Sequence, residues 1–157
     1  MAKRKLPKEY TDYIARVIWY LRREILHGEY GMTVRYVASL ASEDHTTTTA
    51  EIHIDPVYLN FKLVLSDFVL DLWKKKSYQK IGGILAHELC HLLTQPMKML
   101  AVADAAPSQE KGIGEVNERQ TQRVANVLDS LLPAKWYEPE TLKTLLRHDD
   151  DITGAEV

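Results

Sequence analysis

The feature that most constrains this chain is an H-E-x-x-H motif, formed by His87, Glu88 and His91 inside an apolar run over residues 84–93. A helix has about 3.6 residues per turn, so a helix through this run places both histidines on one face. Two imidazoles one turn apart can bind a single Zn²⁺ ion, and the glutamate between them suits a general base. The alternative is a buried helix with two satisfied core histidines, but Glu88 would then need a partner.

Length and charge narrow the class of protein. The chain has 157 residues, of which 45% are hydrophobic, enough for one core and short for two, so residues 1–157 are predicted to form a single domain. Residues 1–7 and 149–157 are expected to be loosely held ends. The net charge of −2 provides no general attraction to nucleic acid, so a nucleic-acid partner is not expected.

Neither a membrane span nor a secretory signal is visible. No apolar stretch approaches the roughly 18 residues that a span requires, and no apolar segment follows the basic residues near the start. The single cysteine, Cys90, cannot form an internal disulfide, which is typical of a reducing compartment. We expect a cytoplasmic protein without membrane contact, and Cys90 as a small core residue.

The first third of the chain contains signals for a helix and two strands. Apolar residues at spacings of three and four predict an amphipathic helix over residues 8–26. Residues 32–40 are rich in β-branched and aromatic side chains, and residues 50–55 alternate polar with apolar, so both predict strands. A hairpin of these two strands is the expected arrangement, and Pro56 ends the second one because proline cannot donate to a ladder.

The remaining segments are predicted to be mainly helical. One long helix is expected over residues 58–75, and a second, over residues 78–94, contains the motif and is apolar nearly all round, which predicts a central position. Pro96 is expected to end that helix. Residues 97–114 are expected to form a long irregular segment, of the kind that often serves a site.

Two further helices are predicted over residues 115–132 and 139–148. The fold class expected from these elements is α+β, mostly helical with a short antiparallel sheet.

A catalytic zinc has three protein ligands and leaves the fourth position to water, so two histidines are insufficient. The metzincin continuation requires glycine and histidine where this chain has Thr94 and Met97, which excludes that subclass. The downstream helix offers Glu115 and Glu118, which share a helical face. The residues alone leave both carboxylates open, as well as the alternative that either one only faces solvent near the start of its helix.

Residues 117–122 (NERQTQ) resemble the N-E-x-x-(Ser/Thr)-Asp pattern of gluzincin metallopeptidases, in which a glutamate downstream of H-E-x-x-H supplies the third ligand. The resemblance implies Glu118 as that ligand, with Glu115 as the alternative. Gln122 stands where the family has an aspartate that accepts a hydrogen bond from a metal-bound histidine. Its carbonyl can accept the same bond without a charge. The chain is also similar to minimal gluzincins, to phage-borne metallopeptidases and to ImmA/IrrE-like peptidases.

The resemblance implies a small zincin-like fold and a zinc-dependent metalloendopeptidase that acts on polypeptides. One Zn²⁺ per chain is expected on His87, His91 and Glu118, where it would activate a water molecule for attack on a peptide carbonyl. Glu88 would accept the proton and return it to the leaving amine. Two other readings remain open: a regulatory module that keeps the metal without catalysis, and a phage accessory protein without metal.

Other candidate residues are expected around this centre. Tyr137 and His148 are candidate donors to the developing oxyanion, although a core tyrosine and a surface histidine are the simpler readings. By its position and alternation, the strand over residues 50–55 resembles the edge strand with which zincins pair an extended substrate. Ile52, His53 and Ile54 are therefore predicted to form a substrate-pairing strand, with His53 open to a plain surface role.

Overall fold

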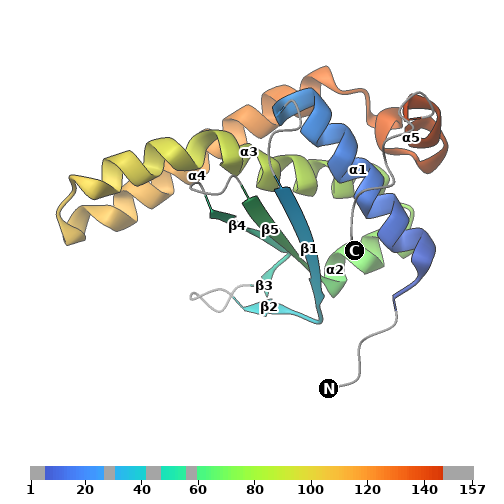
Figure 1. Ribbon diagram of the computed structural model, residues 1–157, viewed down its shortest axis with the longest axis horizontal. Coiled ribbons are helices and arrows are strands. Elements are labelled where there is room, and N and C mark those ends of the chain that lie inside the picture. Colours follow the sequence, from blue (N-terminus) through green and yellow to red (C-terminus); the bar gives the residue numbers. More distant parts are fainter. Residues whose placement is uncertain (1–5, 27–30, 42–46, 56–59, 147–157) are drawn as a thin grey trace.

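The computed structural model describes residues 6–26, 31–41, 47–55 and 60–146 (Figure 1). Its helices are α1 (Lys8–Leu26), α2 (Asp67–Lys74), α3 (Tyr78–Ala103), α4 (Glu110–Leu131) and α5 (Pro139–Leu145), with short 3₁₀ helices η1 (Pro107–Gln109) and η2 (Ala134–Tyr137). The strands are β1 (Gly31–Val37), β2 (Leu40–Ala41), β3 (Thr47–Thr48), β4 (Ala50–Asp55) and β5 (Asn60–Ser66). The chain is α+β and mostly helical, as predicted.

The main sheet has three strands in the order β1-β5-β4, while β2 and β3 form a separate antiparallel pair. β4 runs antiparallel to β5, from Ala50 opposite Leu65 to Asp55 opposite Asn60. β1 pairs with the other side of β5 in parallel, so the sheet is mixed, and the antiparallel expectation holds only for part of it. The predicted hairpin between the strands of residues 32–40 and 50–55 is wrong, because β5 lies between them.

The helix predicted over residues 58–75 is wrong in its first half, since β5 occupies residues 60–66 and α2 only residues 67–74. Phe61, Leu63 and Leu65 alternate along β5 and are all buried. From Leu63 to Ser66 the strand is buried without interruption, and such a run is hard to distinguish by its period from a buried helix. The strand ends at Ser66, whose hydroxyl donates to the Thr49 carbonyl (2.8 Å).

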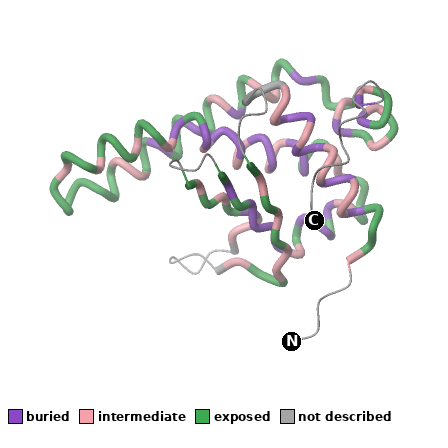
Figure 2. The backbone as a smooth tube through the Cα atoms, viewed as in Figure 1, coloured by how far each residue is buried: buried purple, intermediate pink, exposed green. Residues whose placement is uncertain are grey.

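The core lies between α1, the sheet and the first half of α3 (Figure 2). α1 confirms the amphipathic helix predicted over residues 8–26, and its apolar stripe is buried at Ile14, Val17 and Ile18. Ile81, Leu85 and Leu89 of α3 are likewise 0% exposed. Burial of each such side chain contributes about 1.5–3 kcal/mol, which fixes the first half of α3 in place.

α3 does not end at Pro96 as predicted; it continues to Ala103. Proline lacks the N–H that would bond the carbonyl of Leu92, and its ring crowds that carbonyl, which costs about 3 kcal/mol in a helix interior. The continuation is supported by α4, which packs along α3 in the opposite direction (Figure 1). Tertiary packing therefore outweighs the local signal of a single proline.

The irregular segment predicted over residues 97–114 is also wrong. A short turn joins the end of α3 to η1 (Pro107–Gln109), and α4 begins at Glu110, five residues earlier than expected. Residues 95–103 and the first turns of α4 together form an arm that extends from the body of the molecule (Figure 1). We call these segments, residues 95–115, the α3–α4 arm.

The C-terminal elements close the core on the far side of α3. η2 carries Tyr137, whose ring lies where a Cβ at Gly82 would be, so position 82 has room only for glycine. Tyr13 of α1 donates its hydroxyl to the Tyr137 carbonyl (2.9 Å). α5 falls within the helix predicted over residues 139–148, whose last two residues lie outside the described part of the chain.

Candidate metal centre

The two motif histidines lie one turn apart on α3, on the side that faces α4 and β4. Their rings are perpendicular, with centroids 5.1 Å apart. Their side chains are 18% and 16% exposed for His87 and His91, so each ring is mostly enclosed but reachable from solvent. The opposite side of the same helix is anchored in the core by Leu85 and Leu89, which fixes the segment of α3 from which both imidazoles project.

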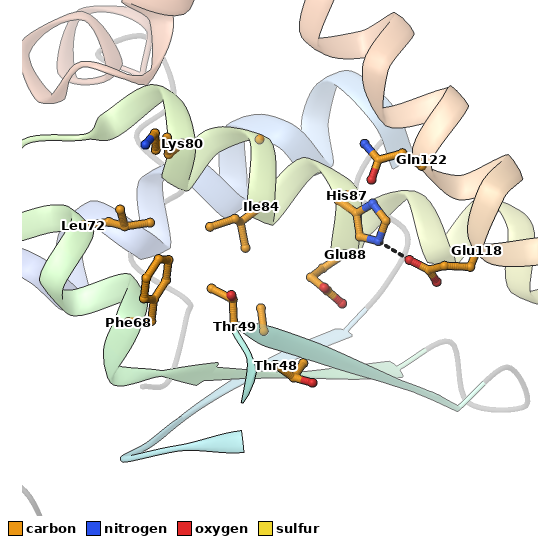
Figure 3. Close-up of a pocket in the computed structure, with 12 residues that line it drawn as sticks. Thr48, Thr49, Phe68, Leu72, Lys80, Ile84, His87, Glu88, Glu118 and Gln122 are labelled. Atoms are coloured by element: carbon orange, nitrogen blue, oxygen red, sulfur yellow. Dashed lines mark ion pairs between the residues drawn. The ribbon is translucent and has the colours of Figure 1, made fainter. Parts of the chain in front are cut away.

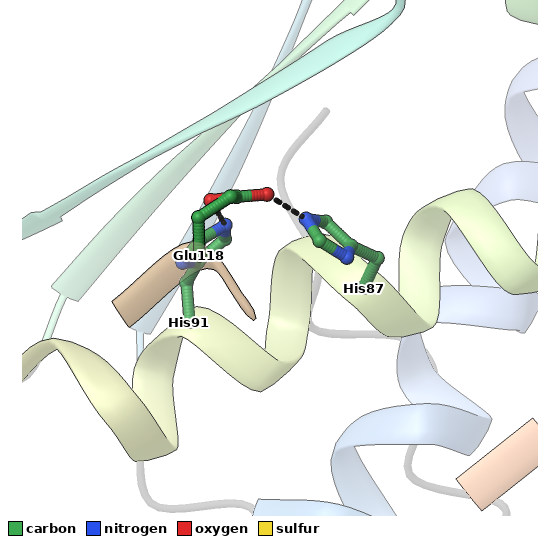
Figure 4. A group of neighbouring side chains, drawn as sticks. All are labelled: His87, His91 and Glu118. Atoms are coloured by element: carbon green, nitrogen blue, oxygen red, sulfur yellow. Dashed lines mark ion pairs between the residues drawn. The ribbon is translucent and has the colours of Figure 1, made fainter. Parts of the chain in front are cut away.

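Glu118 of α4 meets both histidines (Figure 4). His87 Nε2 is 2.9 Å from Glu118 Oε1, and His91 Nε2 is 3.4 Å from Glu118 Oε2. Ligand atoms of the three residues all lie within 4.8 Å of one another. In the part of the chain that the structure describes, this is the one group of three or more such residues close enough to hold a metal ion.

The donor set fits a small divalent metal ion. Two neutral imidazole nitrogens and one carboxylate form a ligand set that leaves a fourth position open, as in catalytic zinc sites. With metal–ligand bonds of about 2.0–2.1 Å, the ligand atoms around a tetrahedral zinc lie roughly 3.3 Å apart. The separations of 2.9 and 3.4 Å, one to each carboxylate oxygen, are close to that value, and no two ligand atoms are more than 4.8 Å apart, so the three residues are close enough to share one ion.

His91 is oriented by a threonine that the sequence analysis did not single out. Thr121 of α4 is fully buried and donates its hydroxyl proton to the Asn117 carbonyl (3.0 Å). Its oxygen lies 3.3 Å from His91 Nδ1 and 2.7 Å from the hydroxyl oxygen of Thr94, so it can accept a hydrogen bond from the His91 ring. When the proton of the His91 ring is on Nδ1, this contact holds the ring and leaves Nε2 unprotonated, which is the tautomer that binds a metal ion through Nε2. The one signal for Thr121 was its place in the N-E-x-x-(Ser/Thr) pattern.

His87 has a different environment. Its Nδ1 atom is buried and has no hydrogen-bond partner among the described residues. Gln122, the predicted partner of a metal-ligating histidine, lies beside the His87 ring (Figure 3), but its amide donates to Asn126 Oδ1 (2.8 Å) instead. Among the described residues His87 Nδ1 has no partner and His91 Nδ1 contacts Thr121, so the bond from a histidine to the Gln122 carbonyl stays a prediction.

Glu115, the alternative third ligand, lies away from the cluster. It is exposed, and its backbone carbonyl accepts a hydrogen bond from Arg119 Nε (3.3 Å). The sequence suggested that Glu115 lies in the first turn of its helix. Because α4 begins at Glu110, Glu115 lies in the second turn instead. The structure thus brings Glu118, and not Glu115, to the two histidines.

Glu88 lies beside the cluster without belonging to it. Burial raises its pKa from 4.5 to about 7, and the charges of Glu118 and Glu51 act in the same direction. A hydrogen bond from the backbone N–H of Ile52 opposes these effects by stabilising the carboxylate. A carboxylate with a pKa near neutrality can both accept and return a proton at physiological pH.

Two cavities, of about 550 and 320 Å³, meet at Glu88 and share His87 and Glu118 in their walls, while His91 lines only the smaller one. β4 borders both of them and is an edge strand of the sheet. Ile52 and Ile54 line the smaller cavity. His53 is exposed, with Nε2 3.3 Å from Glu51 Oε1, which matches the surface role left open for it. We call the two cavities together the cleft.

The remaining candidates lie elsewhere. Tyr137 is fully buried against Gly82 and lines neither cavity of the cleft, which matches its simpler interpretation as a core tyrosine, while its role as an oxyanion donor stays a prediction. His148 falls outside the described residues. Cys90 is buried, as expected, and burial raises the pKa of its thiol to about 11, which favours an inert core thiol.

Comparison of the chain with protein-family models, with curated proteins and with solved structures found no match. The resemblance to gluzincins therefore depends on the H-E-x-x-H motif and on residues 117–122. None of the helices in the described ranges combines the length and the apolar character that a membrane crossing requires.

Proposed function

We propose that this chain is a zinc-dependent metalloendopeptidase of the gluzincin type. The observation that carries the proposal is the convergence of His87, His91 and Glu118, from two helices, next to a carboxylate that is left out of the cluster. A purely structural zinc has four protein ligands, whereas this group supplies three and faces an open cleft. These are the residues that the two sequence segments indicate, the H-E-x-x-H motif for the histidines and NERQTQ for Glu118.

The chemistry divides between the metal and the protein. When bound, zinc supplies Lewis acidity, which polarises a carbonyl and makes a water molecule acidic near neutral pH. Glu88 is the group of this chain that takes up the water's proton and delivers it to the leaving amine. Its raised pKa suits both transfers, and the N–H of Ile52 holds its carboxylate toward the cleft.

The substrate is proposed to lie along β4. An edge strand offers backbone groups that can pair with an extended polypeptide, and β4 borders the cleft on the side opposite the histidines. Because the N–H of Ile52 donates to Glu88, a substrate strand would pair with other backbone groups of β4. Specificity would then depend on the cavities on either side of the cluster.

The test combines metal analysis with hydrolysis. Protein purified under mild conditions should contain close to one zinc ion per chain, and zinc-loaded protein should cleave a mixed peptide library. Glu88→Gln should retain zinc and fold but lose at least about 10²-fold in kcat/KM, because an amide cannot accept the proton. Absence of zinc binding above background overturns the metal centre. Zinc binding without any hydrolysis indicates the non-catalytic module.

A further inference from the structure

Lys98 is a lysine of the arm that lies along the cleft. α3 carries it there because the helix continues past Pro96. His91, Gln95 and Lys98 follow one another at helical spacing, so they share one face of α3, and all three line the smaller cavity. Lys98 is partly buried, whereas the residues on either side of it in the sequence are exposed. Its side chain therefore belongs to the wall of the cleft and not to the outer surface of the arm.

The ammonium group of Lys98 has no counter-ion in the described part of the chain. Among the described residues that line the smaller cavity, Lys98 is the one lysine or arginine, and no ion pair joins it to another described residue. The carboxylates of this cavity have other contacts: Glu118 meets the two motif histidines, Glu88 accepts from a backbone N–H, and Glu51 contacts a histidine of its own strand. A lysine side chain offers three donors and no acceptor, so this positive charge is available to an anionic group of a ligand.

Lys98 lies a short way along the cleft from the metal cluster. It follows His91 by seven residues, which is about 10 Å along a helix axis, and helical side chains lean back toward the N-terminus. Burial lowers the pKa of the His91 ring, Glu118 opposes this effect, and the positive charges of His87 and Lys98 lower the pKa further. A substrate paired with β4, on the opposite wall, advances about 3.3 Å per residue and would therefore reach Lys98 about two or three residues from its cleaved bond.

We propose that Lys98 binds a carboxylate of the polypeptide substrate, about two or three residues from the cleaved bond, and so favours substrates that carry a negative charge at this place. The inference rests on the proposed peptidase function, because the metal cluster fixes where the cleaved bond lies. The carboxylate is that of an aspartate or glutamate side chain or that of the C-terminus of the substrate. Either one would accept charge-assisted hydrogen bonds from the ammonium group.

The activity test uses amidated peptides that carry glutamate, glutamine or lysine at one position, placed in turn at these distances before and after the cleaved bond. Zinc-loaded wild type should cleave the best glutamate peptide about 5- to 10-fold faster than its glutamine counterpart in kcat/KM, and added salt should reduce this ratio. Lys98→Met should bring the ratio close to one, and Lys98→Glu should favour the lysine peptide. Lys111→Glu is the matched control, because Lys111 is an exposed lysine of the same arm that lines neither cavity.

Two features of this design keep the result specific. Each variant is scored by a ratio between two peptides, so a change in zinc affinity that affects all peptides equally cancels. A second series of peptides ends at the same distance after the cleaved bond, with a free or an amidated C-terminus. A preference that depends on Lys98 in this series alone assigns the carboxylate to the end of the substrate chain, and one in the first series assigns it to a side chain.

A binding measurement separates this inference from the proposed function. Fluorescence anisotropy is measured with zinc-loaded Glu88→Gln protein, with and without Lys98→Met, for labelled peptide pools with glutamate, with glutamine, or with glutamine and a free C-terminus. Tighter binding of a pool with the added carboxylate, lost in Lys98→Met, supports the carboxylate site even if wild type hydrolyses nothing, in which case the peptidase proposal fails alone. No preference in either series, a preference that Lys98→Met leaves unchanged, equal effects of Lys98→Glu and Lys111→Glu, or no peptide binding by any variant overturns the role of Lys98.

Discussion

The two halves of α3 belong to different environments although they form one helix. The first half is buried at Ile81, Leu85 and Leu89 and contacts α1, α2 and β4. The second half, past residue 95, exposes Met97 and Leu100 to 67% and 68% and extends with α4 as the arm. The first half is fixed by the core of the molecule, whereas the second half depends on packing against one neighbouring helix.

The metal cluster lies at the boundary between these regions. His87 and His91 come from the rigid half of α3, and Glu118 comes from α4 just after the arm. The contact between Thr94 and Thr121 (2.7 Å) fixes how α4 lies against α3 at this level. The positions of two candidate ligands are therefore set by the core and that of the third by the packing of the two helices, so metal binding at this site should link the arm to the body.

The largest effect is expected from removal of the ligand on the α4 side. Glu118→Ala should reduce zinc affinity by more than the roughly 10–100-fold that outer partners of a metal site contribute, and hydrolysis should be lost with it. Glu115→Ala should keep zinc, because Glu115 is exposed and lies outside the cluster. Competition with a zinc chelator measures both affinities. The reverse result would move the ligand to Glu115.

Substitutions in the two halves of α3 should lower the free energy of unfolding by very different amounts. Leu85→Ala removes a side chain that is 0% exposed and should lower the free energy of unfolding by about 2–5 kcal/mol. Leu100→Ala, at 68% exposure on the arm, should change it by no more than about 0.5 kcal/mol. Urea denaturation of the zinc-free proteins provides both numbers. Similar losses for the two variants would mean that the arm is as tightly packed as the body.

Thr121 should act on the metal through His91. Thr121→Val removes the hydroxyl that accepts from His91 Nδ1, so zinc affinity should fall by about 10–100-fold, while Thr121→Ser should restore most of it. Measuring the free energy of unfolding of the zinc-free variants shows how much of the loss in zinc affinity comes from a less stable fold. If valine and serine bind zinc with equal affinity, the hydroxyl has no part in orienting the ligand.

The smallest effect concerns the pH dependence of the zinc-free protein. Because the pKa of Glu88 is raised to about 7, the folded chain keeps a proton that the unfolded chain loses above pH 4.5. Stability from this group is fully present below 4.5 and is lost as the pH rises through 7. Wild type should therefore lose on the order of 1 kcal/mol relative to Glu88→Gln over this range, since water reaches the cleft. Equal pH profiles in chelator would contradict the assignment.

The sequence predicted the elements whose period was unambiguous. The apolar stripe of residues 8–26 has a clear helical spacing, and α1 follows it. Residues 60–66 were misread because the exposed and buried residues alternate only over residues 60–63, and every residue from Leu63 to Ser66 is buried. The parallel pairing of β1 with β5 joins strands far apart in the chain, which local patterns do not encode.

Two boundary errors have the same origin. Pro96 and the glycines at 112 and 114 are local signals against a helix, yet α3 and α4 run through all three positions. Each of these residues destabilises a helix interior by about 1–3 kcal/mol, and the stabilisation from packing two long helices against each other can exceed that cost. A single-residue rule cannot include an energy that depends on a partner helix.

The sequence by itself determined the two histidines and the glutamate between them, because helical spacing alone puts residues four apart on one face. It also narrowed the third ligand to two carboxylates. Only the tertiary structure shows that Glu118, and not Glu115, lies next to the two histidines. The tertiary structure also brings the buried Thr121 to His91, and it places β4, Phe68 and Leu72 around the cleft. These contacts join separate elements, so their geometry follows from how the helices and the sheet pack and not from any local spacing.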